Sequence, residues 1–364
     1  MHREQTEAIF KDLSKKMVLL SGPRQVGKSW LARSIMIRFE RPRYLNWDNN
    51  QDESVILNLG ACRTWTSGRA QADFEQKNGE EAGPYCSYCP TDEPIPELLF
   101  RPLLEAWTYH MIVGGMPAAV RAWVQEQDMG SCRQRQEEIV LSYERDMAKH
   151  VEPRLVAKVW SVWNSIPAQL ARENRKFVYR LIREGARAKD YEDAIRWIAQ
   201  TGTIHLVHRI DKPGTPLSAY ADPHDFKIYY VDVGLLCRKS ELGVSAWLEQ
   251  DAFFTEFKGA LAENYVLQAL VPGSPTIGYW TSEATAEVDF IIQDERRIIP
   301  VEVKSGQAVR SKSLALFLGK HGLPFGIRFS TRNVDLNSPI VNLPIFLAGS
   351  LKTILPGIIA AKSP

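Results

Sequence analysis

Short apolar runs alternate with amphipathic stretches over much of the chain, a pattern typical of an α/β fold. Near the N-terminus, the apolar run 17–21 predicts a strand that is buried on both faces. Leu31, Ile35 and Phe39 then recur at helical spacing and predict a helix directly after it. Residues 43–47 predict a second strand, so the chain opens as an α/β domain.

The middle of the chain is patterned mainly for helices. Ile139, Tyr143 and Met147 recur at helical spacing on one face of a further helix. The remaining predicted helices cover 98–113, 118–124, 159–170, 177–183 and 191–199. Two strands are predicted after them, over 204–207 and 226–231. Three short helices followed by a β-ribbon favour a winged-helix-like region.

In the last third of the chain, the pattern again predicts both helix and strands. A helix is predicted over 253–270 and strands over 277–280, 287–292 and 297–304. Glu263 lies on the apolar face of that helix. A buried carboxylate is costly unless it has a partner, so Glu263 requires one.

Charged residues recur on the last two of these strands. Glu302 and Lys304 are two positions apart and project from the same face of a strand. The polar turn at 294–295 predicts a hairpin, in which a two-residue loop places Asp289 opposite Pro300. Asp289 then shares a face with Glu302 and Lys304, whereas a slip of one residue would turn it to the other face.

Two carboxylates beside a lysine suit either a nuclease centre or a structural ion-pair cluster. In a nuclease, Asp289 and Glu302 would bind Mg²⁺, a hard cation that prefers oxygen ligands. Glu263 would join that set of ligands, and Lys304 would orient the attacking water. The candidate catalytic residues are therefore Glu263, Asp289, Glu302 and Lys304.

A phosphate-binding motif connects the first strand to its helix. The sequence Gly22-Pro23-Arg24-Gln25-Val26-Gly27-Lys28-Ser29 matches G-x-x-x-x-G-K-[ST]. In such a loop, backbone N–H groups cradle the phosphates, the lysine contacts the β- and γ-phosphates, and the serine hydroxyl binds Mg²⁺. These residues predict a nucleoside triphosphate site with Ser29 as a metal ligand. The alternative is a chance match in an ordinary strand–turn–helix.

The acidic strand that a P-loop ATPase uses to hold Mg²⁺ is missing from the pattern. Asn58 follows the apolar run 55–57, where an acidic pair is expected. Residues 60–96 are rich in Gly, Ser, Pro and charge, which favours loop or disorder. A lone C-x-x-C at Cys86 and Cys89 has no second pair with zinc-site spacing. The sequence thus predicts ATP binding and leaves hydrolysis open.

Composition adds the compartment and a second candidate partner. The 364 residues fit two or three domains, and the net charge of +2 means that any basic surface is local. Five cysteines do not form a disulfide framework, and we find neither a signal pattern nor an apolar run that spans a bilayer. We therefore expect a cytoplasmic protein. The middle region is basic, which suits either DNA contact or a solvated helix surface: Arg172, Arg175, Lys176, Arg180, Arg183, Arg187 and Lys189.

Taken together and in order, the motifs resemble a known family. They are 22–29, Gly114-Gly115-Met116-Pro117, 226–235, 259–264, and 286–290 with 300–305. The chain resembles the bacterial and archaeal AAA-type ATPases that end in a domain of unknown function with a restriction-endonuclease-like core. The resemblance implies ATP and Mg²⁺ as cofactors and agrees with a winged-helix-like middle.

These observations give an α/β fold in four parts. We expect a truncated P-loop domain at 1–96, a helical lid-like segment at 97–154, a winged-helix-like domain at 155–250 and a restriction-endonuclease-like domain at 251–364. The leading hypothesis is an ATP-binding protein, an ATPase if active, whose nucleotide state is coupled to DNA or to a protein partner. Oligomers are compatible with it. The alternatives are a Mg²⁺-dependent nuclease and a non-catalytic DNA-binding adaptor.

Overall fold

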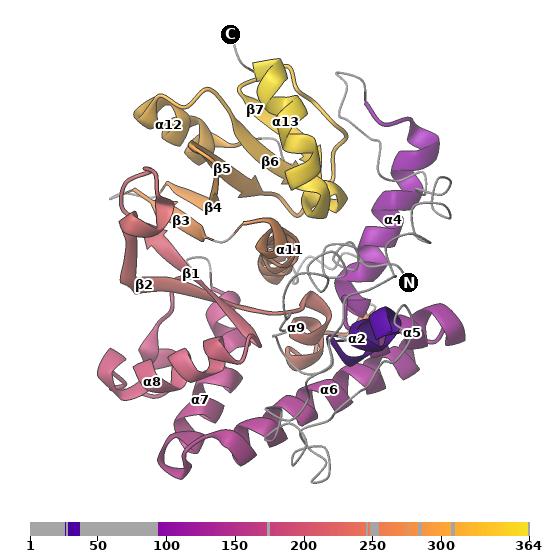
Figure 1. Cartoon of the computed structure of the whole chain (residues 1–364), viewed down its shortest axis with the longest axis vertical. Helices are drawn as coiled ribbons and strands as arrows, with labels where there is room; N and C mark the ends of the chain where they lie inside the picture. The colour runs from indigo at the N-terminus through magenta and orange to yellow at the C-terminus, as the bar shows by residue number, and fades with distance from the viewer. Residues whose placement is uncertain are drawn as a thin grey trace, which may run out of the picture. The chain divides into compact units, whose positions relative to one another are not determined.

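The computed structural model describes residues 26, 28–36, 94–172, 175–244, 247, 255–274, 276–282, 286–306 and 310–362 (Figure 1). The chain divides into two compact units, Met1–Ser87 and Tyr88–Pro364. In the first unit, helix α2 (Lys28–Met36) confirms the helix predicted after the phosphate-binding motif, and it buries Leu31 and Ile35. Most of the motif itself, the predicted strands 17–21 and 43–47 and the stretch 60–93 lie outside the described residues.

Helices open the second unit, close to where the sequence predicts them. They are α4 (Glu97–Val113), α5 (Pro117–Glu126), α6 (Met129–His150), α7 (Pro153–Leu170) and α8 (Ala188–Gln200). The helix predicted over 177–183 is wrong, because only the single 3₁₀ turn Tyr179–Leu181 forms there. Lys176 pairs with Lys227 in an antiparallel bridge, and the Phe177 N–H donates to the Phe226 carbonyl at 2.9 Å. Pairing with a strand therefore takes the backbone groups that a helix would need.

A seven-stranded mixed sheet forms the centre of the second unit. Its strands are β1 (Ile204–Ile210), β2 (Ala221–Tyr230), β3 (Ile277–Thr281), β4 (Glu287–Asp294), β5 (Arg297–Val303), β6 (Gly326–Ser330) and β7 (Ile340–Pro344). They lie in the order β2-β1-β3-β4-β5-β6-β7. β3, β4 and β5 form an antiparallel meander, while β5, β6 and β7 are parallel. The β1–β2 ribbon joins this sheet because β1 runs parallel to β3.

The C-terminal part follows the order helix, three strands, helix, strand. It comprises α11 (Thr255–Leu270), β3 to β5, α12 (Lys312–His321) and β6 (Figure 1). α11 packs against β5, and α12 packs against β4 and β5. Leu314 and Phe317 of α12 share a buried cluster with Trp280 and Val288 of the meander. The parallel β5–β6 pair needs a crossover connection, which α12 supplies.

The β4–β5 hairpin has a different register from the predicted one. Its two-residue turn is Glu295–Arg296, with Glu295 at a φ of 49°, instead of 294–295. Ile291 consequently pairs with Pro300, and Phe290 with Val301. The prediction that Asp289 lies opposite Pro300 is therefore wrong by two residues. Because a shift of two keeps the alternation of side chains, Asp289 comes next to Glu302.

Among the described residues, one helical stretch has the length and composition to cross a membrane. This stretch, Ile345–Lys362, has a mean hydropathy of 1.4, and 33% of it is buried within the protein. It contains α13 (Leu351–Lys362), whose Leu351, Ile354, Leu355 and Ile358 are buried. The sequence analysis found no such stretch, and a buried face of this kind is also found in core helices of folded domains.

Candidate functional site

Glu263 on α11 has the partners that a buried carboxylate requires. Its Oε1 forms an ion pair with the Arg175 guanidinium, and its Oε2 accepts a hydrogen bond from the Tyr229 hydroxyl at 3.0 Å. The Glu263 side chain is only 5% exposed. Asn264, the next residue, bonds both backbone groups of Tyr230, which fixes α11 against β2. The motif 259–264 thus orients Glu263.

Asp289 lies near the start of β4, with its carboxylate against β5. Its Oδ2 accepts a hydrogen bond from the Val303 N–H at 2.7 Å. Burial, and then the negative charge of Glu263, raise the pKa of Asp289 well above its ordinary value, although Lys227 acts in the opposite direction. Two buried carboxylates that lie close together disfavour each other's ionisation in this way.

Glu302 and Lys304 are brought together on β5 and the residue after it. Lys304 Nζ lies 2.6 Å from Glu302 Oε1. Burial alone would lower the pKa of Lys304, but the hydrogen bond and charge of Glu302 raise it. Glu302 Oε2 is buried and has no hydrogen-bond partner among the residues that the structure describes. An unpaired buried oxygen is costly, so this atom points to a missing ligand.

We call Glu263, Asp289 and Glu302 the acidic cluster. Asp289 and Glu302 offer the oxygen donors that Mg²⁺ prefers, and the unpaired Glu302 Oε2 fits a cation beside them. Glu263 is turned to Arg175 and Tyr229 instead. In agreement, no group of three or more His, Cys, Asp or Glu is arranged to hold a metal ion within the described part of the chain. Ser29, the metal ligand predicted at the phosphate-binding motif, has its side chain outside the described residues.

Arg175 and Lys227 accompany the acidic cluster, and the sequence analysis placed neither of them there. Arg175 comes from the segment between α7 and α8, and Lys227 from β2. Lys227 is 0% exposed, forms an ion pair with Glu287 and lies 4.8 Å from the centre of the Tyr279 ring. The signal for it was a lone lysine within the apolar run 226–231. No local pattern separates Arg175 from the other basic residues around it.

The Gly114–Pro117 motif has a structural role close by. Asp232 is buried, and its Oδ2 accepts a hydrogen bond from the Gly115 N–H at 2.7 Å. Its Oδ1 accepts from the Leu235 N–H at 3.0 Å, at the start of α9 (Val233–Lys239). Gln268 of α11 donates to the same carboxylate at 3.2 Å. One carboxylate therefore joins the α4–α5 loop to α9 and α11.

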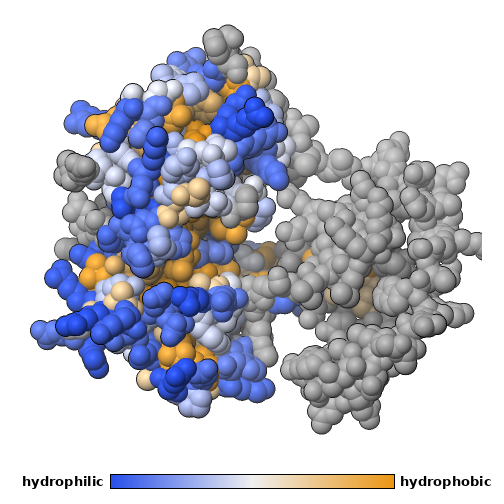
Figure 2. All heavy atoms as spheres, turned by 60° about the vertical axis from the view of Figure 1, so that its left-hand side comes forward, coloured by the Kyte–Doolittle hydropathy of each residue, from blue (hydrophilic) through white to orange (hydrophobic). Residues whose placement is uncertain are grey.

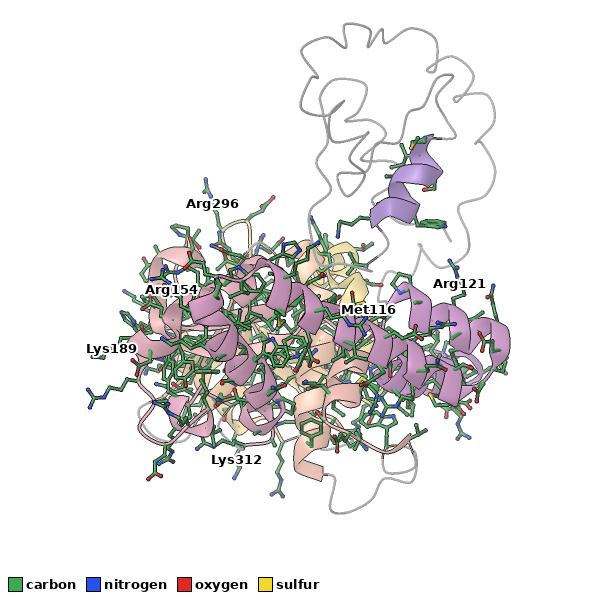
Figure 3. The ribbon with its side chains drawn as sticks, turned by 90° about the horizontal axis from the view of Figure 1, so that it is seen from below. Met116, Arg121, Arg154, Lys189, Arg296 and Lys312 are labelled. Atoms are coloured by element: carbon green, nitrogen blue, oxygen red, sulfur yellow. The ribbon has the colours of Figure 1, made fainter. Side chains whose placement is uncertain are left out.

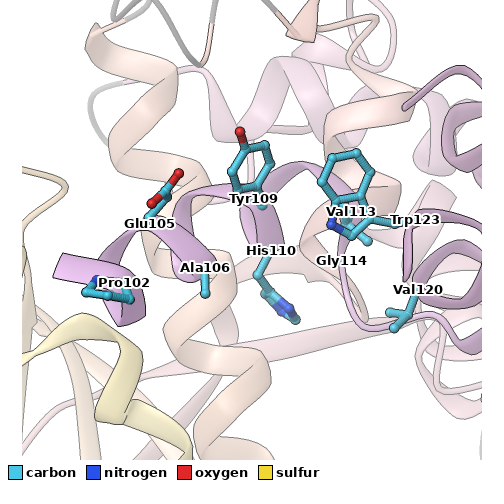
Figure 4. A pocket seen from close by; sticks show the side chains of 9 residues that line it. All are labelled: Pro102, Glu105, Ala106, Tyr109, His110, Val113, Gly114, Val120 and Trp123. Carbon is cyan, nitrogen blue, oxygen red and sulfur yellow. The ribbon is translucent and has the colours of Figure 1, made fainter. Parts of the chain in front are cut away.

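A pocket of about 400 Å³ opens between α4 and α5. Figure 4 shows the side chains that line it, drawn from these two helices and the loop that joins them. Tyr109 and Trp123 stack with their ring centres 5.2 Å apart. Their neighbours in the lining include His110 and Glu105. This pocket could not be predicted from the sequence, because its lining comes from two separate helices.

Two known families match parts of the chain. Residues 104–246 match a domain of unknown function, DUF8612, and residues 258–346 match another, DUF4143. DUF4143 is a domain found in AAA-ATPase-associated proteins. The second match contains Glu263, Asp289, Glu302 and Lys304. No curated protein and no solved structure matches the chain.

Proposed function

We propose that this protein binds ATP at residues 22–29, as an AAA-type ATPase would, with Mg²⁺ at Ser29. The observation that carries the proposal is the start of α2 at Lys28, the lysine of the phosphate-binding motif. The N-terminus of a helix attracts anions, because its free N–H groups and its dipole face outward. The DUF4143 match supports the same proposal.

In this proposal the protein is cytoplasmic, and its nucleotide state is coupled to DNA or to a protein partner. Lys28 neutralises the β- and γ-phosphates. Gly22 and Gly27 leave room for the phosphates to approach the backbone. ATP hydrolysis would further require an acidic residue that reaches the metal from another part of the chain or from a neighbouring subunit.

The test is ATP binding by the full chain, measured by calorimetry with Mg²⁺ present. We expect Lys28→Ala to weaken binding at least about tenfold, the equivalent of 1.4 kcal/mol. Lys312→Ala is the matched control, since Lys312 is also the first residue of a helix. Unchanged affinity in Lys28→Ala would refute nucleotide binding at this motif.

A second candidate function is a Mg²⁺-dependent nuclease in the C-terminal part. The observation in its favour is the juxtaposition of Asp289 and Glu302 beside Lys304, with Glu302 Oε2 unpaired. The order α11-β3-β4-β5-α12-β6 also resembles the core of restriction endonucleases. Asp289 and Glu302 would hold the ion, and a bound Mg²⁺ would polarise a phosphodiester and activate water. The Lys304 ammonium would hold that water or stabilise negative charge on the phosphate.

A basic surface beside this part supports DNA as the partner. Arg175 and Lys176 are engaged with Glu263 and Asp225. Of the other basic residues, four are exposed, and their side chains form no ion pair within 4.0 Å in the part of the chain that the structure describes: Arg180, Arg183, Arg187 and Lys189. Figure 3 shows Lys189 pointing away from the protein, and Figure 2 shows a largely hydrophilic surface where α7 and α8 lie. Such residues suit contacts to phosphates, which a non-catalytic DNA-binding adaptor would also use.

Nicking of supercoiled plasmid in the presence of Mg²⁺ tests the nuclease. We expect Asp289→Asn and Lys304→Met to abolish nicking. Asp294→Asn at the other end of β4 is the control and should retain it. Nicking that survives both substitutions would exclude this site as its source. DNA binding that salt weakens steeply, without any nicking, would favour the non-catalytic adaptor.

A further inference from the structure

Arg175 reaches the acidic cluster from a distant part of the sequence. It lies 88 residues before Glu263 and forms an ion pair with it. The side chains of Arg175 and Glu263 are 13% and 5% exposed. The neighbouring Lys176 forms a bridge to β2, which holds the segment against the sheet. No step of the proposed nuclease reaction uses this arginine.

The helix that carries Glu263 has room for the guanidinium. Gly259 lies one turn before Glu263 on α11. A Cβ added to Gly259 would lie only 3.0 Å from Nη2 of Arg175. The Arg175 Nε is buried and finds no hydrogen-bond partner within the described parts of the chain, so the ion pair leaves part of the guanidinium unsatisfied there. An arginine held with an unpaired donor is easier to displace than a fully bonded one.

The ion pair keeps Glu263 from sharing a ligand with the other two carboxylates. Protein donors occupy both oxygens of Glu263, whereas none of the described residues bonds to the second oxygen of Glu302. A divalent cation at Asp289 and Glu302 would repel the Arg175 guanidinium and attract the Glu263 carboxylate. The arginine and the metal ion therefore compete for the same carboxylate.

We propose that Arg175 controls metal binding at the acidic cluster by holding Glu263 in an ion pair. When Arg175 leaves, Glu263 joins Asp289 and Glu302 around a divalent cation. This inference rests on the proposed nuclease site and adds its regulation. Arg175 links the acidic cluster to the segment between α7 and α8, which also carries the exposed basic residues. A polyanion bound at that surface would draw Arg175 away and open the metal site.

The experiment measures Mn²⁺ binding to the full chain near neutral pH, by the electron paramagnetic resonance signal of the free ion. Arg175→Met retains the aliphatic packing and removes the charge. We expect it to tighten Mn²⁺ binding at least about tenfold. Glu263→Gln in the same chain should remove that gain. Lys176→Met is the matched control, because Lys176 forms an ion pair with Asp225, and it should leave Mn²⁺ binding unchanged.

Removing Arg175 also leaves Glu263 buried without its cation, which destabilises the fold. Two further measurements therefore accompany the titration. Mn²⁺ should raise the melting temperature of Arg175→Met more than that of the unsubstituted chain. Gly259→Ala keeps the arginine but crowds its guanidinium. Like Arg175→Met, it should therefore tighten Mn²⁺ binding.

The outcomes separate this inference from the function on which it rests. Unchanged or weaker Mn²⁺ binding in Arg175→Met and Gly259→Ala, with binding abolished by Asp289→Asn, would overturn the role of Arg175 and leave the metal site standing. Absence of Mn²⁺ binding in the unsubstituted chain and in every variant would overturn the metal site and this inference together. If Arg175→Met does not fold, the result for Gly259→Ala decides.

Discussion

Gly234 shows how a single residue allows two helices to meet. It is the second residue of α9, where the helix approaches the end of α4. A Cβ at Gly234 would lie 2.7 Å from the Val113 carbonyl oxygen and 2.7 Å from the Gly114 nitrogen. Since both are backbone atoms, neither can rotate away. The hydrogen bond from the Gly115 N–H to Asp232 depends on this close approach.

We expect Gly234→Ala to destabilise the second unit by about 1–3 kcal/mol, the cost of forcing an extra group into a packed site. Gly319 is the matched control, because it lies on the exposed face of α12 with nothing within 4 Å of an added Cβ. Gly319→Ala should stabilise by up to about 1 kcal/mol through helix propensity. Urea unfolding measures both, and equal effects at the two positions would refute the steric argument.

At the scale of elements, the predicted helices and strands succeeded where burial follows the local period. Helix 98–113 is observed as Glu97–Val113, and strand 277–280 as Ile277–Thr281. The prediction over 177–183 failed because the segment pairs with β2, a contact that no local period reveals. The hairpin register failed because the position of the turn sets it, and the sequence Asp294-Glu295-Arg296 allows a turn at either pair of residues.

The N-terminus of α6 supplies a prediction about pH. Asp128 caps this helix, with its carboxylate accepting from the Ser131 N–H at 2.7 Å and the Gly130 N–H at 3.2 Å. The hydrogen bonds from Ser131 and then Gly130 lower the pKa of Asp128 below its ordinary value of 3.8. Its contribution to stability is therefore present above pH 3.8 and is lost as the pH falls through the lower folded-state pKa.

We expect Asp128→Ala to lower the urea midpoint near neutral pH, because the cap is lost. Asp128→Asn keeps an acceptor but does not titrate. It should therefore lose less stability than the unsubstituted chain between about pH 4 and pH 2, the range in which an ordinary or slightly lowered carboxyl pKa lies. An acid-induced loss of the same size in Asp128→Asn would exclude a contribution from this cap.

At the scale of the whole molecule, contacts distant in sequence hold the second unit together. Cys237 Sγ lies 3.2 Å from the Met111 carbonyl oxygen, and Trp247 Nε1 donates to the Thr108 carbonyl at 2.9 Å. Helix α4 is thereby joined to the segment that follows β2. The β1–β2 ribbon in turn extends the sheet formed by the C-terminal strands. These contacts make Tyr88–Pro364 one compact unit.

A chain beginning at Tyr88 should therefore fold by itself. We expect residues 88–364 to unfold in one cooperative transition, with a melting temperature close to that of the corresponding transition in the full chain. Residues 155–364 are the control. They lack α4 and the N–H of Gly115 that Asp232 binds, so they should lose the cooperative transition. Calorimetry of both chains shows whether each has a cooperative transition. Such a transition in 155–364 would show that α4 is dispensable.

The sequence by itself determined the features that depend on local spacing. It predicted the α/β class, most helices and strands of the second unit, the helix after the phosphate-binding motif and the need of Glu263 for a partner. Periodicity and motif spacing suffice for these, because each concerns residues a few positions apart.

Tertiary structure alone decided what meets at the acidic cluster. It placed Asp289 beside Glu302 through a register that the turn sets, and it brought Arg175 and Lys227 among the carboxylates from other elements. The physical reason is that buried charges must be balanced by groups in space, and spatial neighbours need not be sequence neighbours. Only the fold determines which cation pairs with each carboxylate.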